Sequence, residues 1–288
     1  MRVAFVVLHY CQIGVTIDCI SSLLNLKGSP LVVVVDNASP DGSGILLEDK
    51  YKGCEKVSVI LNDRNVGFAT ANNMGFAYAK NELGAELIAV INNDTVIEDV
   101  NFVEKLTTAH YINEYHIIAP DIINKSGEHQ NPFKLLRYDE CIKNYKMLSL
   151  LVFIYSIPLI GEIKARLRLK RNVRKEATND FLEMIVPHGA AIIYTPLWVK
   201  EENIAFRPGT FMYLEEEILY YYVISKKYKT AYAPDLKILH LEDVSTNASF
   251  KNVRKKCLFQ CKQMKKSYKV LIDFLESNNL KIPHNTPF

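Results

Sequence analysis

Short apolar runs and amphipathic segments alternate along the first 120 residues of the chain. Four runs end at clusters of polar turn residues, which is typical of buried strands; they cover residues 3–8, 31–35, 57–61 and 87–91. Segments with helical periodicity follow each run, at residues 15–24, 45–51, 69–80 and 100–113. This alternation predicts parallel strands joined by right-handed helical crossovers, and therefore an α/β fold.

Polar side chains gather where the predicted strands end. Asp36 follows the second strand, Asn65 lies in the loop after the third, and Asp94 follows the fourth. Because parallel strands end at the same edge of a sheet, we expect these three residues at one edge, where α/β folds bind ligands. Asp94 and the amides of Asn92 and Asn93 offer oxygen ligands for Mg²⁺ or Mn²⁺. Asn-Asn-Asp is also ordinary turn chemistry, so this loop does not decide the function by itself.

The loop after the first strand lacks the common phosphate-binding motifs. It reads HYCQIG at residues 9–14, which is neither a GxGxxG turn nor a GxxxxGK[ST] loop. Dinucleotide-dependent dehydrogenases and P-loop enzymes are therefore disfavoured. A sugar nucleotidyltransferase would need a glycine-rich loop with a lysine or arginine here. A nucleotide at this edge needs an acidic group for its base or ribose and a metal for its phosphates, and Asp36 and Asp94 are placed for those roles.

Composition limits the class of protein and its partners. The chain has 288 residues, 49% of them hydrophobic and 23% charged, which suits a globular protein with a sizeable core. A net charge of +3 is too small to indicate a nucleic-acid partner. Six cysteines without a CxxC pair, and no secretory signal, predict reduced thiols in a cytoplasmic protein. No apolar stretch reaches the roughly 18–20 residues that span a bilayer.

Two later segments combine apolar and basic residues. Residues 148–160 are strongly apolar, with Pro158 expected to interrupt a helix, and a basic run follows: Lys164, Arg166, Arg168, Lys170, Arg171, Arg174 and Lys175. This pattern suits either a segment lying on an anionic membrane or a helical subdomain covering an acceptor site.

The C-terminal segment shows the same combination. It has an apolar stripe at helical spacing: Val253, Cys257, Cys261, Met264, Tyr268, Leu271 and Leu275. Another face carries Lys251, Lys255, Lys262, Lys266 and Lys269. Such a helix either packs on its own domain or contacts a membrane.

Several motifs together resemble one enzyme family. They read DNAS at 36–39, NVGFA at 65–69, NNMG at 72–75, NNDT at 92–95, HGAA at 188–191, FMYLEEE at 211–217, YAPD at 232–235 and ILH at 238–240. In this order and spacing they are similar to family 2 glycosyltransferases, especially the rhamnosyltransferase-like members that build bacterial polysaccharides. The resemblance implies a GT-A fold, with a Rossmann-like, mostly parallel mixed sheet flanked by helices.

The resemblance also implies a division of the chain. Residues 1–121 would form the nucleotide-sugar-binding half, 122–181 a helical and basic insertion, 182–245 the acceptor-binding half, and 246–288 an amphipathic helical tail.

The implied nucleotide-binding residues are Leu8, His9, Tyr10, Asp36, Asn37, Asn65, Gly67, Asn92 and Asn93. Asp94 would ligate Mg²⁺ or Mn²⁺, with His240 as a second protein ligand. Asn92 stands where the DxD pattern has its first aspartate, so the motif offers one carboxylate. A histidine after an apolar strand is also often structural.

Three consecutive glutamates open the predicted helix 215–226. Carboxylates favour the positive end of a helix dipole, which is one explanation for them. The resemblance implies a general base at Glu216, with Glu215 or Glu217 as possible substitutes. The base would deprotonate an acceptor hydroxyl during a single displacement, which inverts the anomeric centre.

The expected function follows from this resemblance. We expect an inverting enzyme that transfers rhamnose from dTDP-rhamnose to a lipid-linked glycan, at the cytoplasmic face of an anionic membrane. A UDP-hexose such as UDP-galactose is the alternative donor. A catalytically degenerate scaffold subunit is the alternative to an enzyme.

Overall fold

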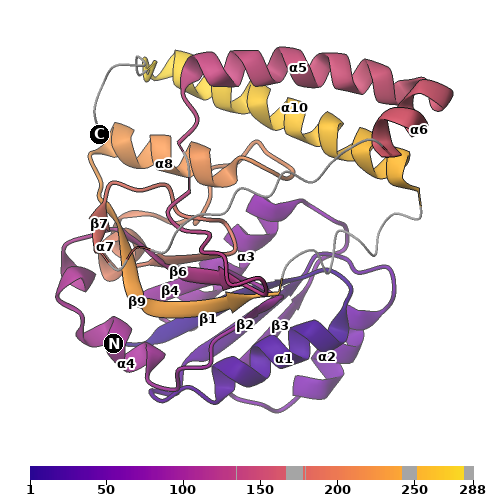
Figure 1. The fold of residues 1–288 in the computed structure, drawn as a ribbon. Coiled ribbons are helices and arrows are strands. Elements are labelled where there is room, and N and C mark those ends of the chain that lie inside the picture. Colours follow the sequence, from indigo (N-terminus) through magenta and orange to yellow (C-terminus); the bar gives the residue numbers. More distant parts are fainter. Residues whose placement is uncertain (134, 167–177, 179, 242–251, 282–288) are drawn as a thin grey trace.

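A mixed β-sheet runs through the centre of the molecule (Figure 1). The computed structural model describes residues 1–133, 135–166, 178, 180–241 and 252–281. Within them the sheet has nine strands, in the order β3-β2-β1-β4-β8-β6-β9-β5, with β7 paired to β9. Their bounds are β1 Val3–His9, β2 Leu31–Asp36, β3 Val57–Leu61, β4 Leu87–Asn92, β5 Thr95–Val96, β6 Ile117–Asn124, β7 Leu182–Glu183, β8 Ala191–Tyr194 and β9 Thr230–His240.

The first half of the sheet is parallel and the second half is mixed. β1 pairs in parallel with β2 and β4, and β2 with β3. β8 then lies antiparallel between β4 and β6, and β6 is parallel to β9. The four valines of β2 have no exposed surface, as expected for a parallel strand covered on both faces. The predicted α/β class and mostly parallel mixed sheet are confirmed.

Helices cover both faces of the sheet. α1 Ile13–Leu24, α2 Ser43–Tyr51 and α4 Phe102–Thr108 contribute to the core on one face. α3 Phe68–Asn81, α7 Pro196–Glu201 and α8 Glu215–Lys226 pack on the other. The single helix predicted for residues 100–113 is wrong. The backbone of Ala109 is extended (φ −64°, ψ 137°), so α4 ends at Thr108 and a separate 3₁₀ turn covers His110–Asn113.

A further helical layer lies on α8, on the side away from the sheet (Figure 1). It consists of α5 Tyr138–Ser156, α6 Pro158–Arg166 and α10 Val253–Ser277. Most of the predicted apolar stripe of α10 is buried in this layer, including Cys257, Cys261, Tyr268, Leu271 and Leu275. The stripe therefore packs on its own domain. All six cysteines of the chain are free thiols.

The apolar segment 148–160 spans the end of α5 and the start of α6. α5 ends at Ser156 and α6 begins at Pro158, where the expected interruption falls. No single helix in the described ranges is long and apolar enough to cross a bilayer, whereas α5 and α6 pass that test together but are bent by 117°. Of the predicted basic residues, Arg168, Lys170, Arg171, Arg174, Lys175 and Lys251 lie outside the described residues.

Candidate active site

The carboxyl ends of β1, β2 and β4 meet at one edge of the sheet. His9 is paired in register with Asp36, and Leu8 with Asn92. The polar loops after β2, β3 and β4 therefore lie at the same edge of the sheet, as predicted. Leu8 and Tyr10 are half-buried at the same edge.

The carboxylate of Asp36 lies against the first turn of α2. Ser39 donates to its Oδ1 from the backbone nitrogen at 3.2 Å and from the hydroxyl at 2.5 Å. A Cβ atom at Gly44 would lie only 2.2 Å from Asp36 Oδ2, so glycine is needed for this close approach. The carboxylate is thus held at a helix N-terminus, where the dipole favours negative charge.

Asn37 joins the loop after β2 to the loop after β3. Its side-chain oxygen accepts from the backbone nitrogen of Val66 at 2.9 Å, and its amide donates to Asn65 Oδ1 at 3.0 Å. Asn37 is buried, whereas Asn65 is exposed, and the Asn65 side-chain oxygen also accepts from the backbone nitrogen of Gly67 at 3.0 Å. Asn37 therefore acts by shaping the loop that presents Asn65.

Gly67 brings this loop against the segment that leads into α8. Its φ is 85°, and a Cβ atom there would lie 2.5 Å from the carbonyl oxygen of Phe211. The backbone nitrogen of Phe68 donates to that same carbonyl at 2.8 Å. No side chain fits at position 67 while this contact is kept, which explains the glycine.

His9 is enclosed and has a structural part in the site. Its Nδ1 lies 2.7 Å from the Thr16 hydroxyl and its Nε2 lies 2.8 Å from the Ser43 hydroxyl. Burial lowers the pKa of His9, against the raising effect of nearby Asp36. Because both ring nitrogens are engaged, the imidazole holds α1 and α2 in place beside β1.

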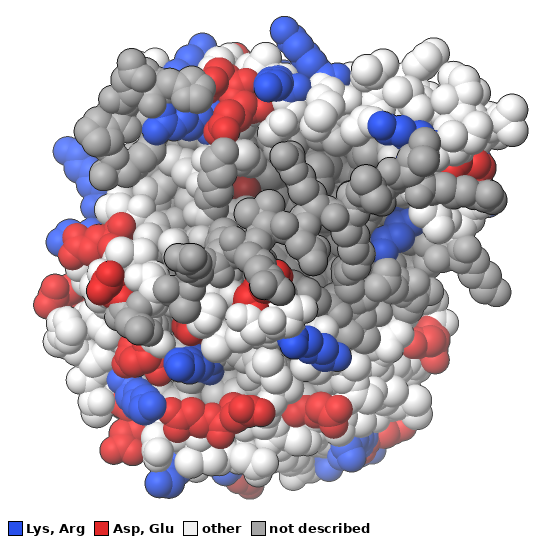
Figure 2. Space-filling view, viewed as in Figure 1, with Lys and Arg blue, Asp and Glu red and all other residues white. Residues whose placement is uncertain are grey.

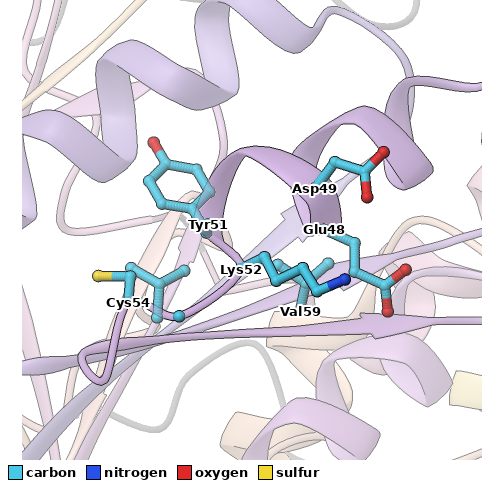
Figure 3. Close-up of a pocket in the computed structure, with 8 residues that line it drawn as sticks. Glu48, Asp49, Tyr51, Lys52, Cys54 and Val59 are labelled. Atoms are coloured by element: carbon cyan, nitrogen blue, oxygen red, sulfur yellow. The ribbon is translucent and has the colours of Figure 1, made fainter.

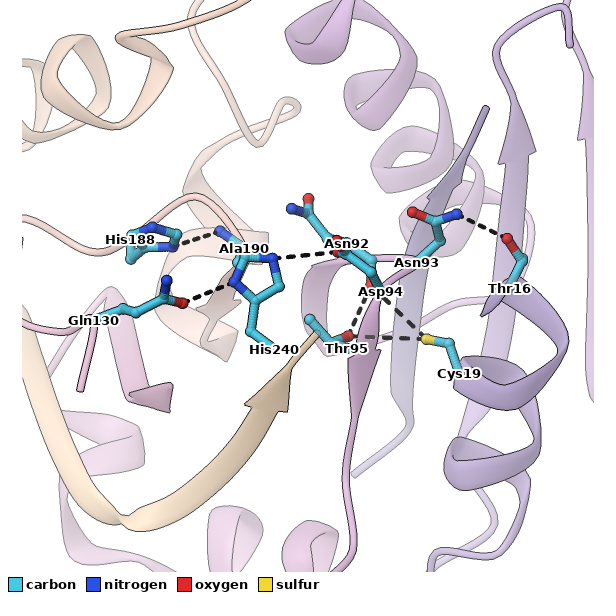
Figure 4. A network of polar contacts seen from close by, with 10 residues as sticks. All are labelled: Thr16, Cys19, Asn92, Asn93, Asp94, Thr95, Gln130, His188, Ala190 and His240. Atoms are coloured by element: carbon cyan, nitrogen blue, oxygen red, sulfur yellow. Dashed lines mark hydrogen bonds and ion pairs between the residues drawn. The ribbon is translucent and has the colours of Figure 1, made fainter. Parts of the chain in front are cut away.

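The loop after β4 is tied down by its own polar groups (Figure 4). The side-chain amide of Asn93 donates to the Thr16 hydroxyl at 2.9 Å, and the Thr95 hydroxyl donates to the carbonyl of Asn92 at 2.7 Å. Asn93 is buried, whereas Asn92 is half-buried. The Asn92 side chain is thus the amide of this loop that lies nearer the surface.

Asp94 and His240 form the candidate metal-binding pair. Asp94 Oδ1 lies 3.3 Å from His240 Nε2, and β5–β9 pairing brings the two residues together. His240 Nδ1 lies 2.7 Å from Gln130 Oε1, the kind of contact that orients a metal-binding imidazole. In the part of the chain that the structure describes, no group of three or more His, Cys, Asp or Glu residues converges. One carboxylate and one imidazole fit a Mg²⁺ or Mn²⁺ ion that takes most of its ligands from a diphosphate and water.

The three glutamates of α8 have different surroundings. Glu215 is 3% exposed and Glu217 is 2% exposed, whereas Glu216 is half-buried. Burial and the Glu216 charge raise the pKa of Glu215 to about 8 and raise that of Glu217 well above its usual range. Glu217 faces the helical layer, where its charge raises the pKa of Cys141. Both carboxyls therefore favour the protonated form more than an exposed glutamate does.

Glu216 lies over the loop that begins β8. A Cβ atom at Gly189 would be 2.8 Å from Glu216 Oε1, so the carboxylate rests directly on this glycine. Burial raises the pKa of Glu216, and the backbone N–H of Gly189 acts in the opposite direction. Of the three glutamates, Glu216 is the least buried and is the one whose carboxylate contacts this loop.

The loop 188–190 connects this carboxylate to the candidate metal-binding pair. The backbone nitrogen of Asn92 donates to the carbonyl of Ala190 at 2.9 Å. The rings of His188 and His240 are in edge contact, with centroids 5.9 Å apart, and His188 Nδ1 accepts from the backbone nitrogen of Ala190 (Figure 4). The candidate base and the polar edge of the parallel half therefore meet at one loop.

Another hollow lies away from this edge. It has a volume of about 390 Å³ and is lined by the end of α2 and the start of β3, including Tyr51, Lys52 and Cys54 (Figure 3). None of the predicted site residues lines it.

The sequence model of the family described as Glycosyl transferase family 2 matches residues 6–184, well over half of the chain. The chain belongs to glycosyl transferase family 2. The low-salt glycan biosynthesis hexosyltransferase Agl10 of Haloferax volcanii is 32% identical over 104 residues, which cover 35% of this chain and 31% of that protein. The dTDP-rhamnosyl transferase RfbF of Shigella flexneri is 36% identical over 101 residues, or 35% of this chain and 32% of that protein. The matched stretch thus spans about a third of the length of these relatives.

Solved structures agree with the fold expected of a family 2 glycosyltransferase. The crystal structure of S. aureus TarS 1–349 has a TM-score of 0.52 and 16% identity, covering 84% of this chain and 60% of that one. The same TarS region in complex with UDP-GlcNAc has a TM-score of 0.52 and 15% identity, covering 87% and 62%. At this identity the likeness concerns the fold alone, and the predicted GT-A fold is confirmed.

Several residues of the site were not among the predicted site residues. Ser39 and Gly44 hold Asp36, Gln130 orients His240, and Gly189 supports Glu216. Gly189 lies in the HGAA motif, so a signal for it was present in the sequence. Gln130 lies in the insertion, where no motif marked it.

Proposed function

We propose that this family 2 member is an inverting glycosyltransferase with Glu216 as its general base. The observation that carries the proposal is the position of the Glu216 carboxylate on Gly189, in the loop that also binds the end of β4. The candidate base and the candidate nucleotide-binding edge, which come from the two halves of the sheet, thus contact the same loop. That is the arrangement a direct displacement requires.

The proposed reaction is a single displacement. The acceptor hydroxyl gives its proton to Glu216 while its oxygen forms a bond to the anomeric carbon. The bond from that carbon to the diphosphate breaks on the opposite face, so the configuration inverts. Mg²⁺ or Mn²⁺ held by Asp94 and His240 would neutralise charge on the leaving diphosphate.

The electrostatics of α8 support this choice of base. A carboxylate whose pKa is raised by burial accepts a proton more readily at neutral pH. The raised pKa values of Glu215 and Glu217 reduce the negative charge beside it.

We infer a dTDP-sugar donor, with rhamnose as the first candidate. The name of the Shigella flexneri relative, a dTDP-rhamnosyl transferase, supports this. A UDP-hexose is the second candidate, which the hexosyltransferase relative and the UDP-GlcNAc complex of TarS support. The proposed acceptor is a lipid-linked glycan of a bacterial cell-surface polysaccharide, reached from the cytoplasmic side of the membrane.

Calorimetric titration with dTDP, UDP and GDP, with and without Mn²⁺, tests the donor site. We expect one diphosphate to bind only with metal, and Asp94→Ala to abolish that binding. Glu216→Gln should bind the same diphosphate normally and lose turnover by about 10²–10⁴-fold. If no diphosphate binds under any condition, the catalytic proposal fails and a scaffold function replaces it.

A further inference from the structure

The corner where α5 meets α6 carries an exposed apolar surface. Six large apolar side chains there are each more than half exposed: Met147, Leu150, Phe153, Leu159, Ile160 and Ile163. We call these six residues the corner patch. None of them is needed for the helical layer, because α5 packs on that layer through its opposite face, including Cys141, Leu148 and Tyr155.

Helical spacing puts the corner patch on one continuous surface. Met147, Leu150 and Phe153 follow one another every three residues and share the outer face of α5. α6 continues the surface after a bend of 117°. Figure 1 shows the two helices projecting together at the edge of the molecule, and Figure 2 shows a mostly uncharged surface over the end where they meet, with charged side chains over the other end of the helical layer. The patch is therefore on a convex projection.

Basic side chains border the corner patch. Lys143 and Lys146 are exposed on the same face of α5, and Lys164 is exposed on α6. Glu162 of α6 lies 3.5 Å from the guanidinium of Arg254, which offsets its charge. Asp139 is exposed in the first turn of α5, at the end away from the bend. The surface next to the patch is thus positive.

We propose that the corner patch docks on an anionic lipid bilayer, with its apolar side chains in the interfacial region and the bordering lysines on lipid phosphates. An amphipathic helix with apolar and basic residues on its outer face binds membranes in this way. A convex corner enters a fluid surface readily, whereas a rigid protein partner would need a matching groove. The inference rests on the proposed function, because a lipid-linked acceptor is what makes membrane docking useful.

Vesicle co-sedimentation tests the docking surface independently of catalysis. The probes are vesicles of phosphatidylcholine alone and vesicles that also contain phosphatidylglycerol. One variant combines Leu150→Ser with Phe153→Ser, and a second combines Lys143→Gln with Lys146→Gln. The matched control combines Ile45→Ser with Leu46→Ser, since these two are equally exposed on α2, outside the helical layer.

We expect the wild type and the α2 control to bind the anionic vesicles equally. The lysine variant should bind about 30-fold more weakly, about five-fold for each lysine. The Leu150 and Phe153 variant should bind at least about ten-fold more weakly. Because all four side chains are exposed, circular dichroism and nucleotide titration of these variants should match the wild type.

Three results would overturn the proposal. If the wild-type protein does not bind anionic vesicles, the docking surface is ruled out. If vesicle binding falls as much in the α2 control as in the corner-patch variants, the corner patch is not the docking surface. If the wild type is a dimer that does not bind vesicles, and only the Leu150 and Phe153 variant is a monomer, the patch contacts a second copy of the chain instead. Nucleotide titration on the same preparations reports separately on the proposed transferase activity.

Discussion

The contact between Gly189 and Glu216 gives a quantitative prediction for catalysis. In Gly189→Ala, the new Cβ atom would lie 2.8 Å from Glu216 Oε1, whereas ordinary contact begins at 3.4 Å. The carboxylate must therefore move by about 0.6 Å, since it is the far end of a flexible side chain. Position 189 is not in the left-handed region, so alanine fits its backbone.

The size of the expected effect follows from that displacement. A misplacement of about 1 Å at a reacting group costs roughly 100-fold in rate, so a shift near 0.6 Å should lower kcat by roughly ten-fold. This corresponds to about 1.4 kcal/mol of activation free energy. The assay is steady-state release of nucleoside diphosphate from the donor, together with calorimetric binding of that diphosphate, which should not change. Gly14→Ala is the matched control, because a Cβ atom there meets nothing within 4 Å.

A double variant decides whether Gly189 acts through Glu216. If it does, Gly189→Ala should have no further effect in a Glu216→Gln background, where the base is already absent. The reasoning would be refuted if the fold reductions in kcat from the two substitutions multiplied in the double variant. A wild-type kcat for correctly folded Gly189→Ala would refute it as well.

Three further predictions concern the supports of the site. Asn37→Ala leaves the backbone nitrogen of Val66 without its partner, so it should lower the unfolding free energy by about 1–3 kcal/mol in a urea titration; unchanged stability would contradict this. Gly44→Ala places a Cβ atom 2.2 Å from Asp36 Oδ2, so calorimetry should show nucleotide affinity reduced by at least about ten-fold; equal affinity would exclude Asp36 from the nucleotide site. The pKa of Glu215 is raised to about 8, so the folded state keeps a proton that the unfolded state loses, and stability should fall as pH rises from about 4.5 to 8. Glu215→Gln should make that fall smaller and be the more stable protein at pH 9, on the order of a few kcal/mol, by denaturant titration at each pH; parallel pH profiles for the two proteins would refute the buried-acid argument.

The parallel half of the fold was predictable because its signals are local. Each apolar run ends at turn residues, and the observed strands differ from the predicted ones by at most one residue at either end. The convergence of Asp36, Asn65 and Asp94 then follows from topology alone. The break at Ala109 was not predictable, since the apolar spacing of residues 100–113 continues through it.

The role of each residue within the site depends on contacts between segments that are distant in the sequence. Nothing near His9 in the sequence indicates that Ser43 will occupy its second ring nitrogen. Likewise, the order of three glutamates does not reveal which one faces Gly189, because that loop comes from residues well before α8. Gln130 reaches His240 from a stretch of the chain in which no motif marked it.

The backbone contact between Gly67 and Phe211 has a consequence for how this protein can diversify. The loop that presents Asn65 touches the segment that enters α8, with no side chain between them. A lineage that reshapes this loop to accept a different sugar nucleotide must also shift the segment carrying Glu216. A change in donor preference is therefore expected to change turnover as well. A mutant library that varies residues 65–67 should vary residues 210–214 at the same time.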